Sequence, residues 1–158
     1  MIFSKSFGYA VRSIMYLGMQ QDHRHMQAKD IALALGIPRH FTGKILKRLA
    51  KEKILLSIKG PSGGFTINEH SLKTPLITVF IITEGKSTLE ACALKFRKCD
   101  SANPCPLHAE IEKFRWDLIQ VLSGKTIESL MTGDEEQLLK SITTLPEKTL
   151  EEINLLIK

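Results

Sequence analysis

The sequence predicts a mainly α-helical protein with one small β-hairpin. Over several segments, apolar residues recur at intervals of three and four, the period of an amphipathic helix. The alternation typical of a strand is confined to ILLSIKGPSGGFTIN, residues 54–68. The chain has 158 residues, 43% of them hydrophobic and 25% charged, so it can form a packed core without disulfides or metal staples.

Positive charge is concentrated in the first half of the chain. Residues 1–70 contain 11 Lys and Arg against 4 Asp and Glu, whereas residues 71–158 contain 11 against 13. A basic half joined to a mildly acidic half predicts a polyanionic partner for the first half only. A basic, solvated surface without a partner is the alternative.

The location of the protein is expected to be cytoplasmic. No apolar run reaches the ~18 residues that cross a bilayer, and Lys5 and Arg12 interrupt the apolar N-terminal stretch. The three cysteines are an odd number, which argues for a reducing compartment and against a disulfide framework. We therefore expect no membrane partner.

Three helices are expected in the basic half. The first spans residues 4–21, the second is AKDIALALGIP and ends at Gly36, and the third begins with Pro38 in PRHFTGKILKRLAKE. A Gly-containing turn joins the second helix to the third, which is the helix-turn-helix pattern. The third helix is expected to bury Phe41, Ile45 and Leu49.

The opposite face of the third helix is cationic near its N-terminal end, where a recognition helix touches base edges. Gly43 lies in the middle of this face. Its missing side chain either lets a DNA backbone approach closely or relieves a crowded helix crossing, and both interpretations stay open. The residues of this helix expected to contact DNA are Arg39, His40, Thr42, Gly43, Lys44 and Lys47.

A hairpin follows the third helix, because two short strands flank the turn sequence GPSGG. A hairpin directly after a helix-turn-helix is a wing, so residues 1–72 are predicted to form a winged-helix DNA-binding domain. A nucleotide-binding phosphate loop is disfavoured, since neither G-K-[ST] nor a helix follows. The wing residues expected to contact DNA are Lys59, Gly60, Pro61, Ser62 and Gly63.

Residues 73–132 are predicted to hold a linker helix from Thr74 to Glu84, a cysteine loop and a long helix that ends at Gly124. Apolar residues in the long helix are spaced 4, 3, 4 and 3, which predicts helix pairing, most simply across a two-fold axis. A core-facing stripe within one subunit is the alternative. The expected dimerisation residues are Leu107, Ile111, Phe114, Leu118 and Val121.

Residues 133–158 are expected to form a C-terminal helical extension. Its last part, with Leu150, Ile153, Leu156 and Ile157, has the spacing of a short amphipathic turn or two.

The cysteine loop, CALKFRKCDSANPCPLH, has the spacing Cys92-x6-Cys99-x5-Cys105-x2-His108. Thiolates select zinc, Cu(I) or iron–sulfur clusters, and a histidine can supply a fourth ligand. Zinc knuckles contain closely spaced cysteine pairs, which are absent from this sequence, whereas a wide loop suits a larger iron–sulfur cluster. Free or structural thiols without a metal remain an alternative.

Several segments together resemble the IscR/NsrR family of bacterial winged-helix regulators. They cover about residues 1–132 and occur in the family's order: SKSFGYAV, the helix-turn-helix, the wing IKGPSGGF, a segment ending in TEG, and the three-cysteine loop followed by PLH. The resemblance implies a homodimeric transcription factor whose iron–sulfur cluster tunes its affinity for DNA.

The resemblance also implies a ligand set. In such proteins three cysteines, here Cys92, Cys99 and Cys105, hold the cluster with a fourth, non-cysteine ligand. In IscR-like members that ligand is the histidine matching His108; in nitric-oxide sensors it is an acidic residue near the N-terminus of the partner subunit. Gly8 stands at that acidic position, and the first cysteine interval is one residue longer than usual. Together these features favour a [2Fe–2S] cluster with His108 over a [4Fe–4S] cluster.

The protein is therefore predicted to be a DNA-binding transcriptional regulator that acts as a repressor and responds to redox state, iron or nitric oxide. A winged-helix regulator using Cys92, Cys99 and Cys105 as a thiol switch or as zinc ligands is the alternative. An enzyme is not expected, because the sequence has no paired catalytic carboxylates, nucleophile motif or small-molecule substrate site. The expected partners are double-stranded DNA and a second copy of the chain.

Overall fold

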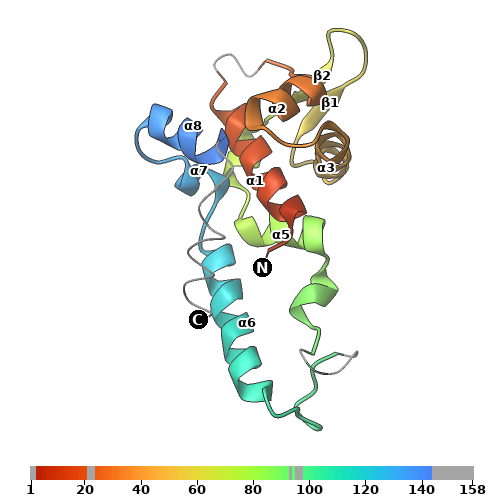
Figure 1. Cartoon of the computed structure of the whole chain (residues 1–158), viewed down its shortest axis with the longest axis vertical. Coiled ribbons are helices and arrows are strands. Elements are labelled where there is room, and N and C mark those ends of the chain that lie inside the picture. Colours follow the sequence, from red (N-terminus) through yellow and green to blue (C-terminus); the bar gives the residue numbers. More distant parts are fainter. Residues whose placement is uncertain (1–2, 21–23, 93, 95–97, 144–158) are drawn as a thin grey trace, which may run out of the picture.

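The computed structural model describes residues 3–20, 24–92, 94 and 98–143 of the 158-residue chain. It consists of a helical body with a hairpin at one end, and of a long helix that extends from the body at the other end (Figure 1). The elements in chain order are α1 (Lys5–Gly18), α2 (Ala28–Leu35), α3 (Arg39–Lys51), β1 (Leu56–Ile58), β2 (Gly64–Thr66), α4 (Glu69–Lys73), α5 (Leu76–Glu84), the 3-10 turn η2 (Lys86–Leu89), α6 (His108–Ser123), α7 (Ile127–Leu130) and α8 (Glu135–Thr143). The predicted fold class, mainly helical with one hairpin, is confirmed.

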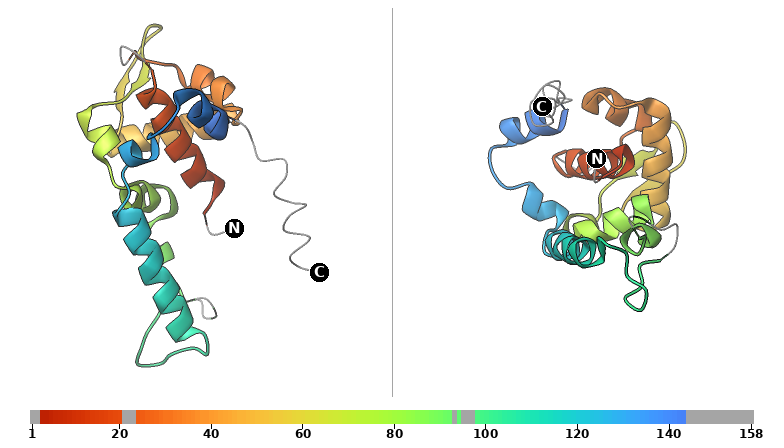
Figure 2. Two further views of the ribbon diagram at one scale, coloured as in Figure 1. Left: turned by 90° about the vertical axis from the view of Figure 1, so that its left-hand side faces the viewer. Right: turned by 60° about the horizontal axis from the view of Figure 1, so that its bottom comes forward.

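Helix α1 runs through the middle of the body, and the other helices surround it (Figure 2). Its N-terminus is capped by Ser4, whose hydroxyl accepts a hydrogen bond of 3.0 Å from the backbone N–H of Ser6. Ala10, Ile14 and Leu17 form the centre of its apolar stripe, and their side chains are buried. The predicted first helix is therefore present, within the bounds expected for it.

The helix-turn-helix is formed by α2 and α3. Helix α2 ends at Gly36, whose φ of 63° is in the left-handed region that glycine adopts without strain. Helix α3 begins directly after Pro38. The expectation that Phe41 is buried was wrong, because its side chain is 45% exposed. Helix α3 packs against both α1 and α2, and this turns Thr42 and Leu46 inward in its place.

The wing is a two-stranded antiparallel sheet with the register Leu56↔Thr66, Ser57↔Phe65 and Ile58↔Gly64. A second pairing joins it to the body. The backbone N–H of Met26 donates to Phe65 O at 2.9 Å, and the N–H of Phe65 donates to Met26 O at 2.8 Å. This single-residue bridge holds β2 against the segment that precedes α2.

The second half of the chain leaves the body and returns to it. Helix α5 packs under α1, where the rings of Phe7 and Phe80 meet edge to face with centroids 5.7 Å apart. It ends at Gly85, as predicted. After the cysteine loop, α6 leads back to the body, where the N–H of Leu76 donates to Lys125 O at 2.8 Å. Helices α7 and α8 then pack beside α1.

Two further observations concern the chain as a whole. Among the residues that the structure describes, no helix has the length and apolar character needed to cross a membrane. The amphipathic turn expected around Leu150, Ile153, Leu156 and Ile157 lies outside the described residues.

Replacing Gly64 by alanine should destabilise the wing and its contact with the body. Gly64 has a φ of 145°, and a Cβ atom there would stand 2.4 Å from Met26 O. We expect Gly64→Ala to lower the free energy of unfolding by about 2–3 kcal/mol, measured by urea titration. Ser62→Ala, an exposed change in the same turn, is the control and should stay within about 0.5 kcal/mol of wild type. Equal stability of the two variants would contradict this description of the wing.

Candidate nucleic-acid interface and cysteine loop

The outer face of α3 carries five of the six residues of this helix that were predicted to contact DNA. Arg39, His40, Lys44 and Lys47 are all exposed. Apart from its own turn of the helix, no described part of the chain lies within 4 Å of a Cβ built on Gly43. The interpretation that Gly43 relieves a helix crossing therefore finds no support in the described part of this chain, and the helix surface there is open.

Two of the predicted DNA contacts are not on the surface. Thr42 is fully buried, and its hydroxyl donates to Pro38 O at 3.1 Å, one helical turn back. Gly63 is also buried, and its backbone N–H closes the wing turn by donating to Gly60 O at 3.1 Å. The prediction that these two residues contact DNA is therefore corrected. Both residues stabilise the backbone that carries the exposed residues, Thr42 in α3 and Gly63 in the wing turn.

A groove separates α3 from the wing. Among the described residues, its lining includes Lys47, Lys51 and Lys59 and contains no acidic side chain. All three lysines are exposed. A concave surface lined by one sign of charge focuses the electrostatic potential and attracts an anionic partner. The phosphate backbone of a nucleic acid fits this surface.

Gln27 holds the wing in place beside α3. Its side-chain amide donates to Gly63 O at 2.8 Å and lies 3.3 Å from Pro61 O. These contacts bind the carbonyl groups of the wing turn to the segment before α2. The sequence analysis missed this residue. The contact spans 36 positions along the chain, and nothing in a local pattern would have indicated it.

The apolar residues of α6 that were predicted to pair with another helix face in two directions. Leu118 turns toward the body and packs against the core, next to the buried Leu122. Phe114 and Val121, in contrast, are 48% and 60% exposed, and Leu107 is exposed one heptad earlier. The stripe is therefore only partly a core-facing stripe within one subunit. The other part is an apolar strip that the described residues do not cover.

The cysteine loop is closed at its base by a small polar network. The backbone N–H of Cys99 donates to Glu90 O at 2.8 Å, and Lys98 forms an ion pair of 2.8 Å with the carboxylate of Glu90. This pairing lowers the pKa of Glu90 and raises that of Lys98, through their mutual hydrogen bond first and their charges second. Arg115 of α6 then donates to Ala91 O at 2.8 Å and ties the loop base to the helix.

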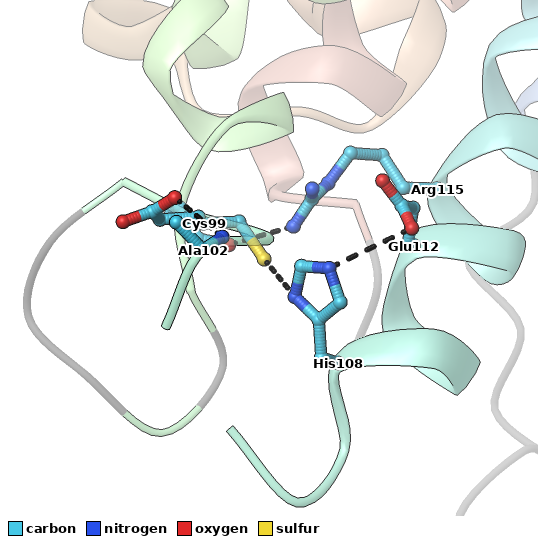
Figure 3. A network of polar contacts seen from close by, with 7 residues as sticks. Cys99, Ala102, His108, Glu112 and Arg115 are labelled. Carbon is cyan, nitrogen blue, oxygen red and sulfur yellow. Dashed lines mark hydrogen bonds and ion pairs between the residues drawn. The ribbon is translucent and has the colours of Figure 1, made fainter. Parts of the chain in front are cut away.

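The imidazole of His108 faces Cys99 (Figure 3). The Cys99 Sγ atom lies 3.1 Å from His108 Nδ1. On the other side of the ring, His108 Nε2 lies 3.6 Å from a carboxylate oxygen of Glu112, and within the described residues this buried nitrogen has no hydrogen-bond partner. His108 is the first residue of α6, so the helix start positions this ring against the loop.

The other two cysteines are near this pair in the chain but do not complete a cluster of ligands. Cys105 is buried, and its carbonyl oxygen accepts a hydrogen bond of 2.9 Å from the backbone N–H of His108. Cys92 is half-buried. Among the described residues, no three His, Cys, Asp or Glu side chains are gathered as metal ligands.

The donor set nevertheless fits a soft metal centre. Three thiols and one imidazole are the ligand types that iron–sulfur and zinc centres take. Two of the four donors already touch, through Cys99 Sγ and His108 Nδ1. The Nε2 atom of His108 faces Glu112 on the other side of the ring. Gly8, in contrast, supplies no ligand.

A winged helix with a basic outer face is typical of a DNA-binding transcriptional regulator. In this chain it is joined to an uncovered helical strip and a cysteine–histidine loop. Comparison with known proteins agrees. The Rrf2 family, described as an iron-dependent transcriptional regulator, matches residues 3–133, and the chain belongs to this family. The relatives named NsrR and IscR, and one from Aquifex aeolicus, are transcriptional regulators rather than enzymes.

Two relatives illustrate the similarity in sequence. An HTH-type transcriptional regulator of Aquifex aeolicus is 31% identical over 140 residues, which are 87% of this chain and 96% of the relative. The regulator NsrR of Geobacillus kaustophilus is 27% identical over 124 residues, which are 78% and 84% of the two chains.

Solved structures share the fold. CymR, the global cysteine regulator of B. subtilis, superposes with a TM-score of 0.66 at 18% identity and covers 84% of this chain and 98% of its own. IscR of T. potens superposes with a TM-score of 0.65, also at 18% identity, and covers 85% and 89%.

Proposed function

We propose that this Rrf2-family regulator binds double-stranded DNA as a homodimer, and that an iron–sulfur cluster in the cysteine loop controls its affinity. The observation that carries the proposal is the position of the Cys99–His108 pair. It lies at the first residue of α6, directly beside the apolar strip that a second subunit would cover. A change at this pair therefore acts on the dimer.

The DNA-binding surface in this proposal is the outer face of α3 together with the wing. A recognition helix enters the major groove with its N-terminal end, and a wing reaches along the backbone or the minor groove. The lysines of the groove supply phosphate contacts, which set affinity more than sequence preference. The proposed contacts are Arg39, His40, Gly43, Lys44, Lys47, Lys59, Gly60, Pro61 and Ser62.

The dimer in this proposal forms along α6. Leu107, Phe114 and Val121 recur every seven residues on the exposed side, so they fill one of the two apolar heptad positions through which helices pair. Helix α6 extends away from the body at the end opposite the wing (Figure 1), so a partner helix can reach it without a clash with the wing. We further propose three parts in the chain: residues 1–72 for DNA, 73–132 for sensing and pairing, and 133–158 as an extension.

The ligands in this proposal are Cys92, Cys99, Cys105 and His108, and a [2Fe–2S] cluster is favoured. Such a cluster, when bound, supplies a centre whose charge and integrity respond to oxidants, iron supply or nitric oxide. The chain's own residues convert this response into a change of shape. No three such ligands are gathered among the described residues, so binding a cluster brings the cysteines together beside the start of α6. A different tilt of α6 changes the spacing of the two recognition helices, which shifts the population of DNA-competent dimers.

A second candidate function is a thiol switch or a zinc site without a cluster. The observation that favours it is the 3.1 Å contact between Cys99 Sγ and His108 Nδ1, because an imidazole beside a thiol is the arrangement of reactive cysteines. A structural relative is named for cysteine regulation, and an oxidised form of Staphylococcus aureus CymR has the same fold, with a TM-score of 0.64.

Alanine at Lys47 or Lys59 should weaken DNA binding and make it less sensitive to salt. Each lysine that neutralises a phosphate releases counterions, so each substitution should reduce the slope of log K against log salt by about one. Fluorescence anisotropy over a salt series measures this slope. Lys113→Ala, at an exposed lysine of α6 that pairs with Asp117, is the control and should leave the slope unchanged. A slope that stays the same in all three variants would count against this DNA-binding face.

Protein purified without oxygen should contain iron and acid-labile sulfide, about two of each per chain for a [2Fe–2S] cluster. Cys105→Ser and His108→Ala should each lower both contents, because each removes a ligand. Iron and sulfide assays with the visible absorption spectrum provide the measurement. A colourless protein that binds DNA normally without iron would contradict the cluster, and zinc at one per chain would favour the second candidate.

Aspartate at Phe114 should convert the dimer into a monomer. A charge placed in an apolar helix pairing loses its hydration without gaining a partner, which costs several kcal/mol. Light scattering coupled to size-exclusion chromatography reports the mass in solution. Gln120→Asp, at an exposed position about 120° away around the same helix, is the control and should remain dimeric. Dimers of equal stability in both variants would place the subunit interface elsewhere.

A further inference from the structure

The C-terminal helix α8 packs back onto the helix-turn-helix. The Rrf2 match ends at residue 133, so α8 lies beyond the residues that this match covers. Ile142 is buried in the core, and Leu138, one turn earlier, packs half-buried against it. Helix α8 touches both α1 and α2, and Figure 2 shows it beside the N-terminal helices rather than beside α6. The proposed functional surfaces leave this helix without a role.

Arg12 of α1 joins α8 to α2. Its guanidinium donates one hydrogen bond to Leu35 O and another to Ile142 O. Leu35 is the last residue of α2, and Ile142 lies in the last turn of α8. Carbonyl groups in a last turn have no helical partner and carry the negative end of the helix dipole. One cation thus satisfies the C-terminal ends of two helices that are far apart in the sequence.

The environment of Arg12 indicates a structural connection rather than a surface charge. The side chain is half-buried, and this burial lowers its pKa by desolvation, while Tyr9 acts in the opposite direction. A guanidinium nevertheless stays protonated in proteins. A partly desolvated cation is held firmly by its acceptors, because few waters compete for its N–H groups.

The connection reaches the turn that starts the recognition helix. Leu35 directly precedes Gly36, and α3 begins three residues after Gly36. The carbonyl oxygen of Thr143, at the end of α8, lies 3.7 Å from the position that a Cβ of Gly36 would occupy. The end of α8 therefore lies over this turn, and Arg12 fixes both sides of the contact.

We infer that Arg12 is a positioning residue for DNA binding, and that α8 braces the helix-turn-helix through it. The brace also continues from the pairing helix. Helix α6 leads through α7, whose Ile127 N–H donates to Thr74 O at 3.2 Å, into α8. The inference rests on the DNA-binding part of the proposed function and is independent of the cluster.

Arg12→Gln should weaken DNA binding by about tenfold, because a turn without its brace spends less time in the arrangement that fits DNA. The salt slope should stay at the wild-type value, since Arg12 contacts no phosphate in this account. Arg12→Lys keeps the charge but presents a single ammonium to two carbonyl groups, so its loss should be intermediate. The probe is the duplex that wild-type protein selects from a random-sequence library, and anisotropy gives the affinity.

A second pair of variants removes the brace from its other end. Ile142→Asp places a charge at a buried position and should release α8, with a loss of affinity similar to that of Arg12→Gln. Leu139→Asp, a comparable change on the exposed side of α8, should bind as wild type does. Combining Arg12→Gln with Ile142→Asp should cost less than about twofold beyond either single variant, because both remove the same contact.

Three outcomes would overturn the inference: wild-type affinity in Ile142→Asp, additive losses in the double variant, or a salt slope reduced by about one in Arg12→Gln, which would indicate a direct phosphate contact. If Arg12→Gln does not fold, the comparison of Ile142→Asp with Leu139→Asp still decides, since neither alters Arg12. A wild-type protein that selects no duplex would instead overturn the proposed function on which the inference rests.

Discussion

The burial of α1 at the centre of the body holds the recognition helix, the linker helix and the C-terminal helices in place. Ala10, Ile14 and Leu17 form its buried stripe, and complete burial of each Ile or Leu side chain contributes roughly 1.5–3 kcal/mol. The recognition helix α3, the linker helix α5 and the C-terminal helices all pack on this one element. Because a closely packed core transmits displacement, a shift of α5 or α8 also displaces α3.

The wing and the cysteine loop lie at opposite ends of the molecule (Figure 1). Control of DNA binding by this loop therefore requires a structural route, and the chain offers two. One runs from the loop base through α5 and α1 to the recognition helix. The other runs through α6 and α7 to α8, which Arg12 connects to the helix-turn-helix. A symmetric dimer adds a third possibility, in which the pairing angle of α6 sets the distance between two wings.

Predictions that rest on local sequence signals agree with the structure. Features that depend on contacts between residues far apart in the chain were missed or mispredicted. Helical periodicity and punctuating glycines placed α1, α2, α3 and α5 close to their observed bounds, since both signals are local. The burial of Phe41 was mispredicted because it depends on how α3 is rotated against two neighbours. Gln27 and Arg12 were missed for the same reason: their partners lie 36 and 130 residues away. The cysteine spacing indicated a loop with metal-ligand chemistry, whereas the contact between Cys99 and His108 became evident only in three dimensions.

The central claim is that the state of the cysteine loop sets the affinity for DNA. Its most direct test compares one anaerobic sample, loaded with iron, before and after removal of the iron by a chelator. Anisotropy with a duplex that the protein selects gives both dissociation constants. Our account predicts that they differ by at least about tenfold, the size of an ordinary allosteric coupling. Equal dissociation constants for the loaded and the iron-free protein would contradict it.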